Sequence, residues 1–280
     1  MGPRDEARRE YAKTEKAGKT AMQRIRLTVE YDGTNYSGWQ RQSNAISVQQ
    51  VLEEALRVFT KEQTVVTGAS RTDAGVHALG QTVHFDTESR IPPEKYSYAL
   101  NTRLPADIRV RESMLAAPDF HARFSTKGKT YRYQFYNSPH ASAIWRNTHA
   151  HVMYPMDVEK MAPELSALVG THDFAGFAAS GSVVKDTVRT IYSAFAQRQD
   201  EVVTLYVTGT GFLYNMVRII AGAVADVATG RVEPGAIARA IASGDRLDLG
   251  VTAPACGLTL MRVYYDESEI PPRYRGNTAQ

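Results

Sequence analysis

The chain has 280 residues, 43% of them hydrophobic, which is typical of a globular protein with one large or two modest domains. Its net charge of +3 permits a nucleic-acid partner but does not by itself indicate one. The single cysteine, Cys256, excludes an internal disulfide framework and is consistent with a reducing cytoplasm. The longest apolar run, residues 219–225, is far shorter than the ~20 residues of a membrane span. We therefore expect a cytoplasmic protein with no membrane partner.

The first half of the chain shows alternating strand and helix patterns. Residues 24–31 alternate polar and apolar, which is the period of a half-buried strand. Ser47 and Gln50 form a capping-box pattern before an amphipathic helix that ends near Phe59. Further strands are predicted at 64–67, 81–86, 107–114 and 129–137, and a short helix at 94–102.

The second half repeats this texture. Asp157 can cap a helix that Gly170 ends, and Pro234 stands where it can open another helix. A further helix is predicted at 213–229, and strands at 187–197, 201–208 and 258–265.

These elements predict an α+β protein made of two similar α/β halves with a cleft between them. The halves cover residues 23–138 and 139–267, and mainly antiparallel sheets are expected in both. Residues 1–22 mix charges of both signs without an apolar core, so we expect a flexible N-terminal arm rather than a signal peptide. Residues 268–280 are expected to form a C-terminal tail.

The densest polar cluster is the run SRTDAGVHA at residues 70–78. A carboxylate beside a guanidinium is held ionised, and an ionised aspartate can attack an electrophilic carbon. Asp73 is therefore a candidate nucleophile next to Arg71. An ordinary turn with an Arg71–Asp73 ion pair is the alternative, and the spacing alone favours it.

Basic and aromatic side chains interleave at residues 127–133. Rings can stack on unpaired bases while cations meet phosphates, so this run indicates RNA binding by Lys129 and Tyr131, with Arg123 adding charge just upstream. On a strand, Tyr131, Tyr133 and Phe135 share one face. The alternative is that these rings simply form core.

Arg218 is embedded in an apolar helix, where an unpaired charge would be very costly. Its pairing can be structural or catalytic, and the local pattern leaves both open. Of the seven histidines, only His149 and His151 are closely spaced, and neither a metal-binding motif nor a phosphate-binding glycine motif is present. We therefore expect no metal, no cofactor and no bound nucleotide.

Six motifs, in order, resemble the tRNA pseudouridine synthase A (TruA) family over most of residues 24–266. Small departures occur at Ser70, where glycine is usual, and at Gly211, where alanine is common. The motifs are YDG with YSGWQRQ at 31–33 and 36–42, RTDAGVHA with GQ at 71–78 and 80–81, FHARF at 120–124, YRY at 131–133, FL with MVR at 212–213 and 216–218, and APA with GL at 253–255 and 257–258.

The resemblance implies a pseudouridine synthase fold with a central basic cleft and a homodimer that binds the anticodon stem-loop of tRNA. It also implies a cofactor-free isomerase that converts uridine to pseudouridine at positions 38, 39 and 40. Asp73 matches the family's nucleophile, Tyr131 the tyrosine that stacks on the uracil and can take the C5 proton, and Arg218 the arginine paired with the nucleophile. Arg71 matches an arginine that helps to displace the base. We also expect His77, Arg123 and Lys129 to contact RNA.

Two other functions fit part of this pattern. A tRNA-binding module or chaperone would keep the basic surface but would not need Asp73. A sister synthase acting on a different RNA would keep the aspartate with different flanking motifs. The residues do not choose between attack by Asp73 on ribose C1′, attack on uracil C6, and a glycal route.

Overall fold

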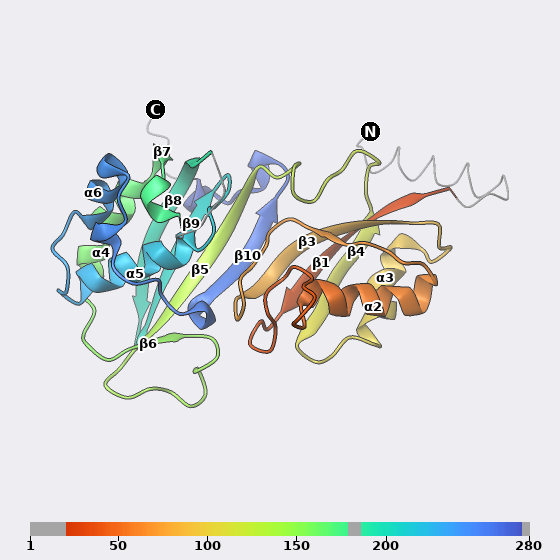
Figure 1. Cartoon of the computed structure of the whole chain (residues 1–280), viewed down its shortest axis with the longest axis horizontal. Helices are drawn as coiled ribbons and strands as arrows, with labels where there is room; N and C mark the ends of the chain where they lie inside the picture. Colours follow the sequence, from red (N-terminus) through yellow and green to blue (C-terminus); the bar gives the residue numbers. More distant parts are fainter. Residues whose placement is uncertain (1–20, 179–185, 276–280) are drawn as a thin grey trace. The chain divides into compact units, whose positions relative to one another are not determined.

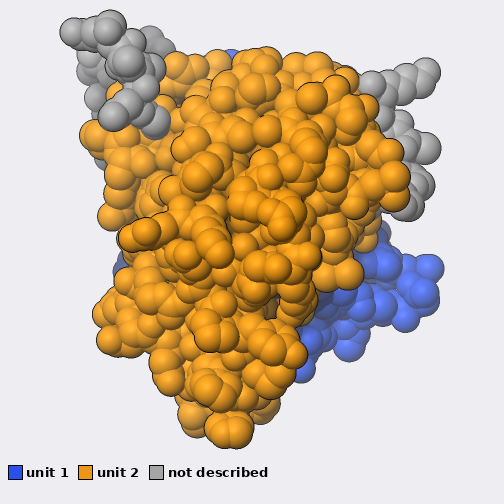
Figure 2. Space-filling model, turned by 90° about the vertical axis from the view of Figure 1, so that its left-hand side faces the viewer, with its two compact units in different colours: residues 1–126 blue, residues 127–280 orange. Residues whose placement is uncertain are grey.

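The computed structural model describes residues 21–178 and 186–275, and they form an α+β protein, as predicted (Figure 1). It divides into two compact units, unit 1 up to Thr126 and unit 2 from Lys127 (Figure 2). Apart from its last two residues, the expected arm at 1–22 lies outside the described residues.

The boundary between the units falls before strand β5 (Gly128–Asn137), whereas the sequence placed a boundary after it. β5 is hydrogen-bonded to β9 (Val202–Gly209) and β10 (Leu258–Tyr264), both of which lie later in the chain. Strand pairing, which periodicity does not specify, therefore assigns β5 to unit 2.

Unit 1 is built on an antiparallel sheet in which β1 lies between β3 and β4. Every second residue of β1 is buried because alternate side chains point to the same face. A short strand, β2, pairs with β3, and helix α3 packs on β4. The elements of unit 1 are β1 (Gln23–Tyr31), α2 (Val48–Thr60), β2 (Thr67–Gly68), β3 (His77–Thr87), α3 (Tyr96–Asn101) and β4 (Ile108–Leu115).

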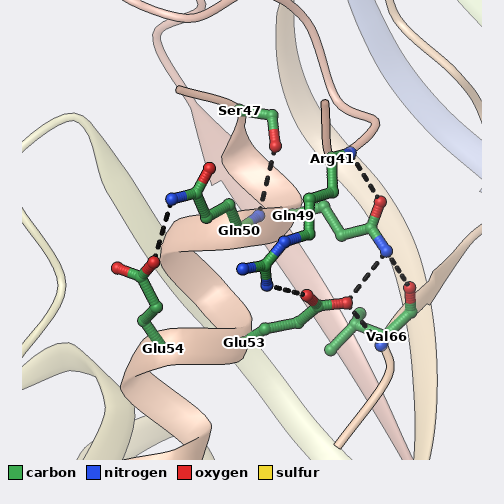
Figure 3. Close-up of polar contacts among 7 residues, drawn as sticks. All are labelled: Arg41, Ser47, Gln49, Gln50, Glu53, Glu54 and Val66. Atoms are coloured by element: carbon green, nitrogen blue, oxygen red, sulfur yellow. Dashed lines mark hydrogen bonds and ion pairs between the residues drawn. The ribbon is translucent and has the colours of Figure 1, made fainter. Parts of the chain in front are cut away.

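Helix α2 begins where the sequence predicts. The Ser47 hydroxyl accepts a hydrogen bond from the backbone N–H of Gln50 (3.3 Å), as an N-cap does. The Gln50 side chain donates to Glu54 instead of reaching back to the cap, so only the Ser47 half of the predicted capping box is formed (Figure 3).

Glu53, nearly buried on α2, ties the helix to its surroundings (Figure 3). Its carboxylate accepts hydrogen bonds from Arg41, Gln49 and the backbone N–H of Val66. The backbone of Val66 is thus bonded by side chains of α2, since Gln49 also donates to its carbonyl oxygen. The strand predicted at 64–67 is wrong over its first three residues, and these bonds account for its absence at Val66.

Unit 2 carries an antiparallel sheet in the order β10-β5-β9-β8-β7, with β6 added in parallel to β5. Helix α4 packs on β8 and α5 on β5, and the three helices of the unit also contact one another (Figure 1). Besides β5, β9 and β10, the elements are β6 (Ala150–Val152), α4 (Val158–Leu168), β7 (Gly170–Asp173), β8 (Val188–Gln199), α5 (Met216–Ala228) and α6 (Ala236–Ser243).

Two helix starts in unit 2 differ from expectation. The helix predicted from residue 213 begins at Met216, after Asn215 in the left-handed conformation. Pro234 does not open α6, because Gly235 takes the N-cap position. The buried carboxylate of Glu164 accepts from the backbone N–H groups of Gly235 and Ile237, so a residue from α4 caps this helix.

Residues 268–275 of the expected tail fold back onto unit 2. Ile270 and Tyr274 are buried with Tyr264, and Tyr274 lies 6.0 Å from the ring of Phe195. Burial of these large side chains stabilises the docked segment. Among the described helices, none is long and apolar enough to cross a membrane.

Candidate active site

Asp73 lies in the loop that joins β2 to β3. The backbone N–H of Val76 donates to the carbonyl oxygen of Asp73 (3.1 Å), closing a turn around Gly75, whose φ is +77°. Thr72 is buried and shares a 2.7 Å hydrogen bond with the Tyr31 hydroxyl. Asp73 is left half-buried at the surface of unit 1.

The base of this loop is clamped by Gln81, which is fully buried on β3. Its side-chain amide donates to the carbonyl oxygen of Ser70 (2.6 Å) and accepts from the N–H of the same residue (3.1 Å). A buried amide with both ends satisfied holds the backbone rigidly. The loop that carries Asp73 is therefore anchored just before Arg71.

A second segment, residues 33–39, is hydrogen-bonded to the backbone of the Asp73 loop. The N–H of Trp39 donates to the carbonyl oxygen of Thr72 (3.0 Å), and the N–H of Gly75 donates to Tyr36 (3.2 Å). Gly38 has a φ of +86°, and a Cβ there would lie 2.5 Å from the Thr72 carbonyl oxygen. A Cβ on Gly33 would lie 2.0 Å from the carbonyl oxygen of Val76. Only glycine lets these two backbones approach so closely.

Replacing Gly38 by alanine should therefore destabilise unit 1 by about 2 kcal/mol or more and lower activity, because strain and a backbone clash act together. Gly230→Ala is the matched control. Gly230 also has positive φ (+73°), but nothing lies within 4 Å of a Cβ built there. The control variant therefore has the backbone strain without the clash. Urea unfolding of both variants measures the difference, and equal losses would show that the close approach is unimportant.

His77, expected to contact RNA, lies at the start of β3 and is only 6% exposed. The N–H of Gly33 donates to its Nδ1 (3.0 Å), so that nitrogen acts as an acceptor. A carboxylate oxygen of Asp32 lies 3.1 Å from the same nitrogen. Burial and the bond from Gly33 show that His77 helps to fix the 33–39 segment, while its contact with RNA stays a prediction.

Arg71 and Arg123 are both exposed in unit 1 and lie near one another. Partial burial, and then the positive charge of Arg71, lower the pKa of Arg123 from its usual value. Two guanidinium groups repel each other and remain charged at neutral pH, so their proximity favours binding of an anion such as a phosphate.

The segment that carries Arg123 is fastened to the sheet of unit 1. Arg24 on β1 forms a two-pronged ion pair with Asp86 (2.7 Å for both bonds) and donates to the carbonyl oxygens of Pro118 and Phe120. The Nδ1 of His84 on β3 accepts from the N–H of Ala122 (3.1 Å). Such bonds between distant residues hold the FHARF motif in place.

The buried His84 should make unit 1 pH-sensitive. Burial, and then the positive charge of Arg24, lower its pKa to about 4. The folded protein keeps this ring neutral, whereas the unfolded chain takes up a proton as the pH falls below ~6.5. Protonation of this histidine therefore favours the unfolded chain. The free energy of unfolding is not reduced by it at pH 7 and falls progressively between about pH 6.5 and 4.

Between pH 6.5 and 5 we expect wild type to lose roughly 1 kcal/mol more than His84→Asn. Asparagine does not titrate, and its side-chain oxygen can accept from Ala122. Urea melts at several pH values measure this, and parallel pH profiles for the two proteins would contradict the assignment.

In unit 2, three of the six motifs meet around Tyr131, Tyr133 and Arg218. Tyr131, on β5, is 8% exposed, and Phe212 meets its ring edge-on at 5.2 Å. Tyr133 and Phe135, on the same face, are fully buried, so they belong to the core. The Tyr133 hydroxyl donates to the carbonyl oxygen of Pro254 (2.7 Å).

Arg218 lies on α5, where its Nε donates to the carbonyl oxygen of Ala253 (2.8 Å) and its Nη1 to the side-chain oxygen of Asn215 (2.9 Å). These two acceptors help to orient the guanidinium, which brings a positive charge into this part of unit 2. Burial raises the pKa of Tyr133, and the positive charge of Arg218 acts in the opposite direction.

Lys129 lies two positions before Tyr131 on β5, so the two share a face of the sheet. Cys256 is half-buried, consistent with a packed small residue, and burial raises its pKa. Among the described residues, no group of three or more His, Cys, Asp and Glu side chains could hold a metal ion.

Comparison with known proteins identifies the family. The family model described as tRNA pseudouridine synthase matches residues 27–125 and 165–266. The tRNA pseudouridine synthase A of Ruminiclostridium cellulolyticum is 51% identical over 245 residues, covering 87% of this chain and 100% of that protein. This chain belongs to the tRNA pseudouridine synthase family. The synthase A of Acetivibrio thermocellus is 49% identical over 244 residues, again covering 87% of this chain and 100% of that protein.

Membership of the family confirms several predictions. The α+β architecture is the pseudouridine synthase fold, and the protein is an isomerase that acts on uridine in tRNA. The chain is thus an RNA-binding enzyme of tRNA modification, not a binding module without turnover.

The structure assigns the predicted site residues to the two units. Arg71, Asp73, His77 and Arg123 lie in unit 1, and Lys129, Tyr131 and Arg218 lie in unit 2. Sequence reasoning did not single out Phe124, which is 77% exposed beside Arg123. No pattern could have found it, because a phenylalanine in the FHARF motif reads equally well as core.

Proposed function

We propose that this synthase isomerises uridines 38, 39 and 40 in the anticodon stem-loop of tRNA, with Asp73 as the nucleophile. The observation that carries the proposal is the construction of the Asp73 loop. Residues 33–39 cradle it, Gln81 clamps it, and both come from motifs that mark the family resemblance. An aspartate on a loop whose backbone is held so firmly is well placed to act as a nucleophile toward one carbon.

The reaction breaks the C1′–N1 glycosidic bond, turns the uracil and forms a C1′–C5 bond. C5 loses its proton and N1 gains one, so nothing is oxidised and no energy donor is consumed. A uridine in a stacked stem must first leave the helix, at a cost of a few kcal/mol. Stacking on an aromatic ring can return ~1–3 kcal/mol of that cost.

Five other predicted site residues have roles in this proposal. Tyr131 stacks on the uracil and takes or relays the C5 proton, and Arg218 stabilises the charge of the nucleophile. Arg71 helps to displace the base. The like charges of Arg71 and Arg123 support binding of the tRNA backbone, to which Lys129 also contributes.

Two further parts of the proposal rest on the sequence alone: the homodimer on the family resemblance, and the cytoplasmic location on the single cysteine. We infer that the enzyme works as a homodimer across which tRNA binds, and that it acts in the cytoplasm. Sedimentation of the purified protein with and without tRNA tests the first inference.

Mapping of pseudouridine in tRNA tests the function. Cells lacking the protein should lose pseudouridine at positions 38–40, and the purified enzyme should restore it on unmodified tRNA. Retention of all three modifications in the deletion strain would contradict the assigned positions. Loss of pseudouridine from another RNA instead would favour the sister-synthase alternative.

A further inference from the structure

Phe124 places a large apolar ring at the surface of unit 1. The ring is 77% exposed, yet it is packed against His121, with 4.3 Å between the ring centres and 31° between the planes. The guanidinium of Arg123 lies 5.9 Å from the centre of the Phe124 ring. An open aromatic surface therefore stands directly beside a positive charge.

The backbone beneath the ring is held by hydrogen bonds within the turn at residues 121–125. The Nδ1 of His121 accepts from the N–H groups of both Arg123 (3.1 Å) and Phe124 (3.2 Å). The N–H of His121 donates to the Ser125 hydroxyl, and the N–H of Ser125 donates back to the His121 carbonyl oxygen, both at 3.0 Å. The side chain is exposed, but its backbone is fixed.

A second layer supports this turn. The ring of His84 lies 4.8 Å from that of His121, and its Nδ1 accepts from the Ala122 N–H. Because buried His84 stays neutral at physiological pH, this acceptor is retained. A ring carried on a rigid turn loses little conformational entropy when a ligand covers it, which favours binding.

The charge near the ring identifies the ligand's chemistry. Arg123 lies close enough to Arg71 for the two charges to interact, and Arg71 precedes Asp73 by two positions in the same loop. A flat apolar ring next to cations matches an unpaired nucleotide, which offers a π-face and a phosphate together. The substrate of this family, tRNA, supplies such nucleotides in its loops.

We propose that Phe124 is a stacking platform for an unpaired base of the tRNA substrate, with Arg123 pairing a phosphate beside that base. The platform acts in substrate positioning and is separate from the reacting groups. It rests on tRNA being bound by unit 1, as the proposed function requires, but not on which uridine reacts.

Binding measurements on four variants test the proposal. Phe124→Tyr keeps the ring, Phe124→Leu keeps apolar bulk without it, and Phe124→Ala removes both. Tyr98→Leu is the matched control, since Tyr98 is another exposed ring of unit 1 (72%) with a cation, Lys95, 5.3 Å from its centre. The ligands are an unmodified tRNA transcript and a fully paired RNA duplex of equal length.

We expect the Leu and Ala variants to bind tRNA roughly 10-fold more weakly, while the Tyr variant and the Tyr98→Leu control bind like wild type. Binding to the duplex, which has no unpaired base, should be unchanged in all four. In tRNA carrying 2-aminopurine at single loop positions, the fluorescence of one position should be quenched by wild type and less so by the Leu variant.

Three results would overturn the proposal. Wild-type tRNA affinity in Phe124→Leu would show that the ring is not used. An equal loss for tRNA and duplex would assign Phe124 to the fold or the charge surface. A change of molecular mass in the Leu variant, with tRNA binding altered only through assembly, would make the ring a contact between copies of this chain.

Failure of the proposed function would look different. If wild type binds tRNA and quenches 2-aminopurine but forms no pseudouridine at positions 38–40, the assigned positions are wrong and the platform stands.

Discussion

Replacing Asp73 by asparagine should reduce the rate of pseudouridine formation by at least ~10³-fold, equivalent to roughly 4 kcal/mol of barrier. Asparagine is nearly isosteric, and the backbone of residues 70–76 and Gln81 make bonds that anchor the loop in both proteins. The fold should therefore survive the change. The amide carries no negative charge, so it can neither attack carbon nor stabilise a developing oxocarbenium ion.

The assay is release of tritium from C5-labelled uridine in tRNA, measured in single turnovers beside a binding isotherm. Asp119→Asn is the charge-matched control, because it removes an exposed carboxylate from the same unit. The control should react like wild type.

Two outcomes would count against the assignment. Wild-type tritium release by Asp73→Asn would remove Asp73 from the chemistry. A parallel loss of binding, rate and thermal stability would instead make Asp73 a structural partner of Arg71, the ordinary turn that spacing alone favours.

Replacing Tyr131 by phenylalanine should lower the rate by ~10²-fold or more while tRNA affinity stays within a few-fold of wild type. The ring remains, and with it the edge-on contact to Phe212 and the stacking surface for uracil. Only the hydroxyl that would take or relay the C5 proton is removed.

Tyr136→Phe is the matched control for Tyr131→Phe. Tyr136 lies near the C-terminal end of the same strand, β5, and its hydroxyl donates to the carboxylate of Glu201. Loss of that hydroxyl should leave the rate unchanged. If Tyr131→Phe also turns over normally, the hydroxyl has no part in the reaction and Tyr131 contributes stacking alone.

Much of the local structure follows from the sequence because its causes are local. The alternation of β1 predicts a strand whose every second residue is buried, and the structure confirms it. Ser47 and Asp157 begin α2 and α4, since each side chain accepts a hydrogen bond from its own first turn. The motif around Asp73 likewise identifies the family without any knowledge of packing.

Where the sequence prediction fails, the cause is a partner far away in the chain. Val66 is not in a strand because Glu53 and Gln49 take its backbone hydrogen bonds. The N-terminus of α6 is capped by Glu164 from another helix rather than begun by Pro234. Neither partner can be read from the neighbouring residues.

The candidate site also combines features that the sequence predicts with features that only the tertiary structure decides. The residue types of the RTDAGVHA and FHARF motifs indicate a carboxylate and cations meeting RNA, and that much the sequence determined. Tertiary structure alone buries His77 against Gly33 and exposes Phe124 above His121. The physical reason is that exposure depends on which strands and turns cover a side chain, and those contacts join residues such as Arg24 and Phe120 that lie far apart in sequence.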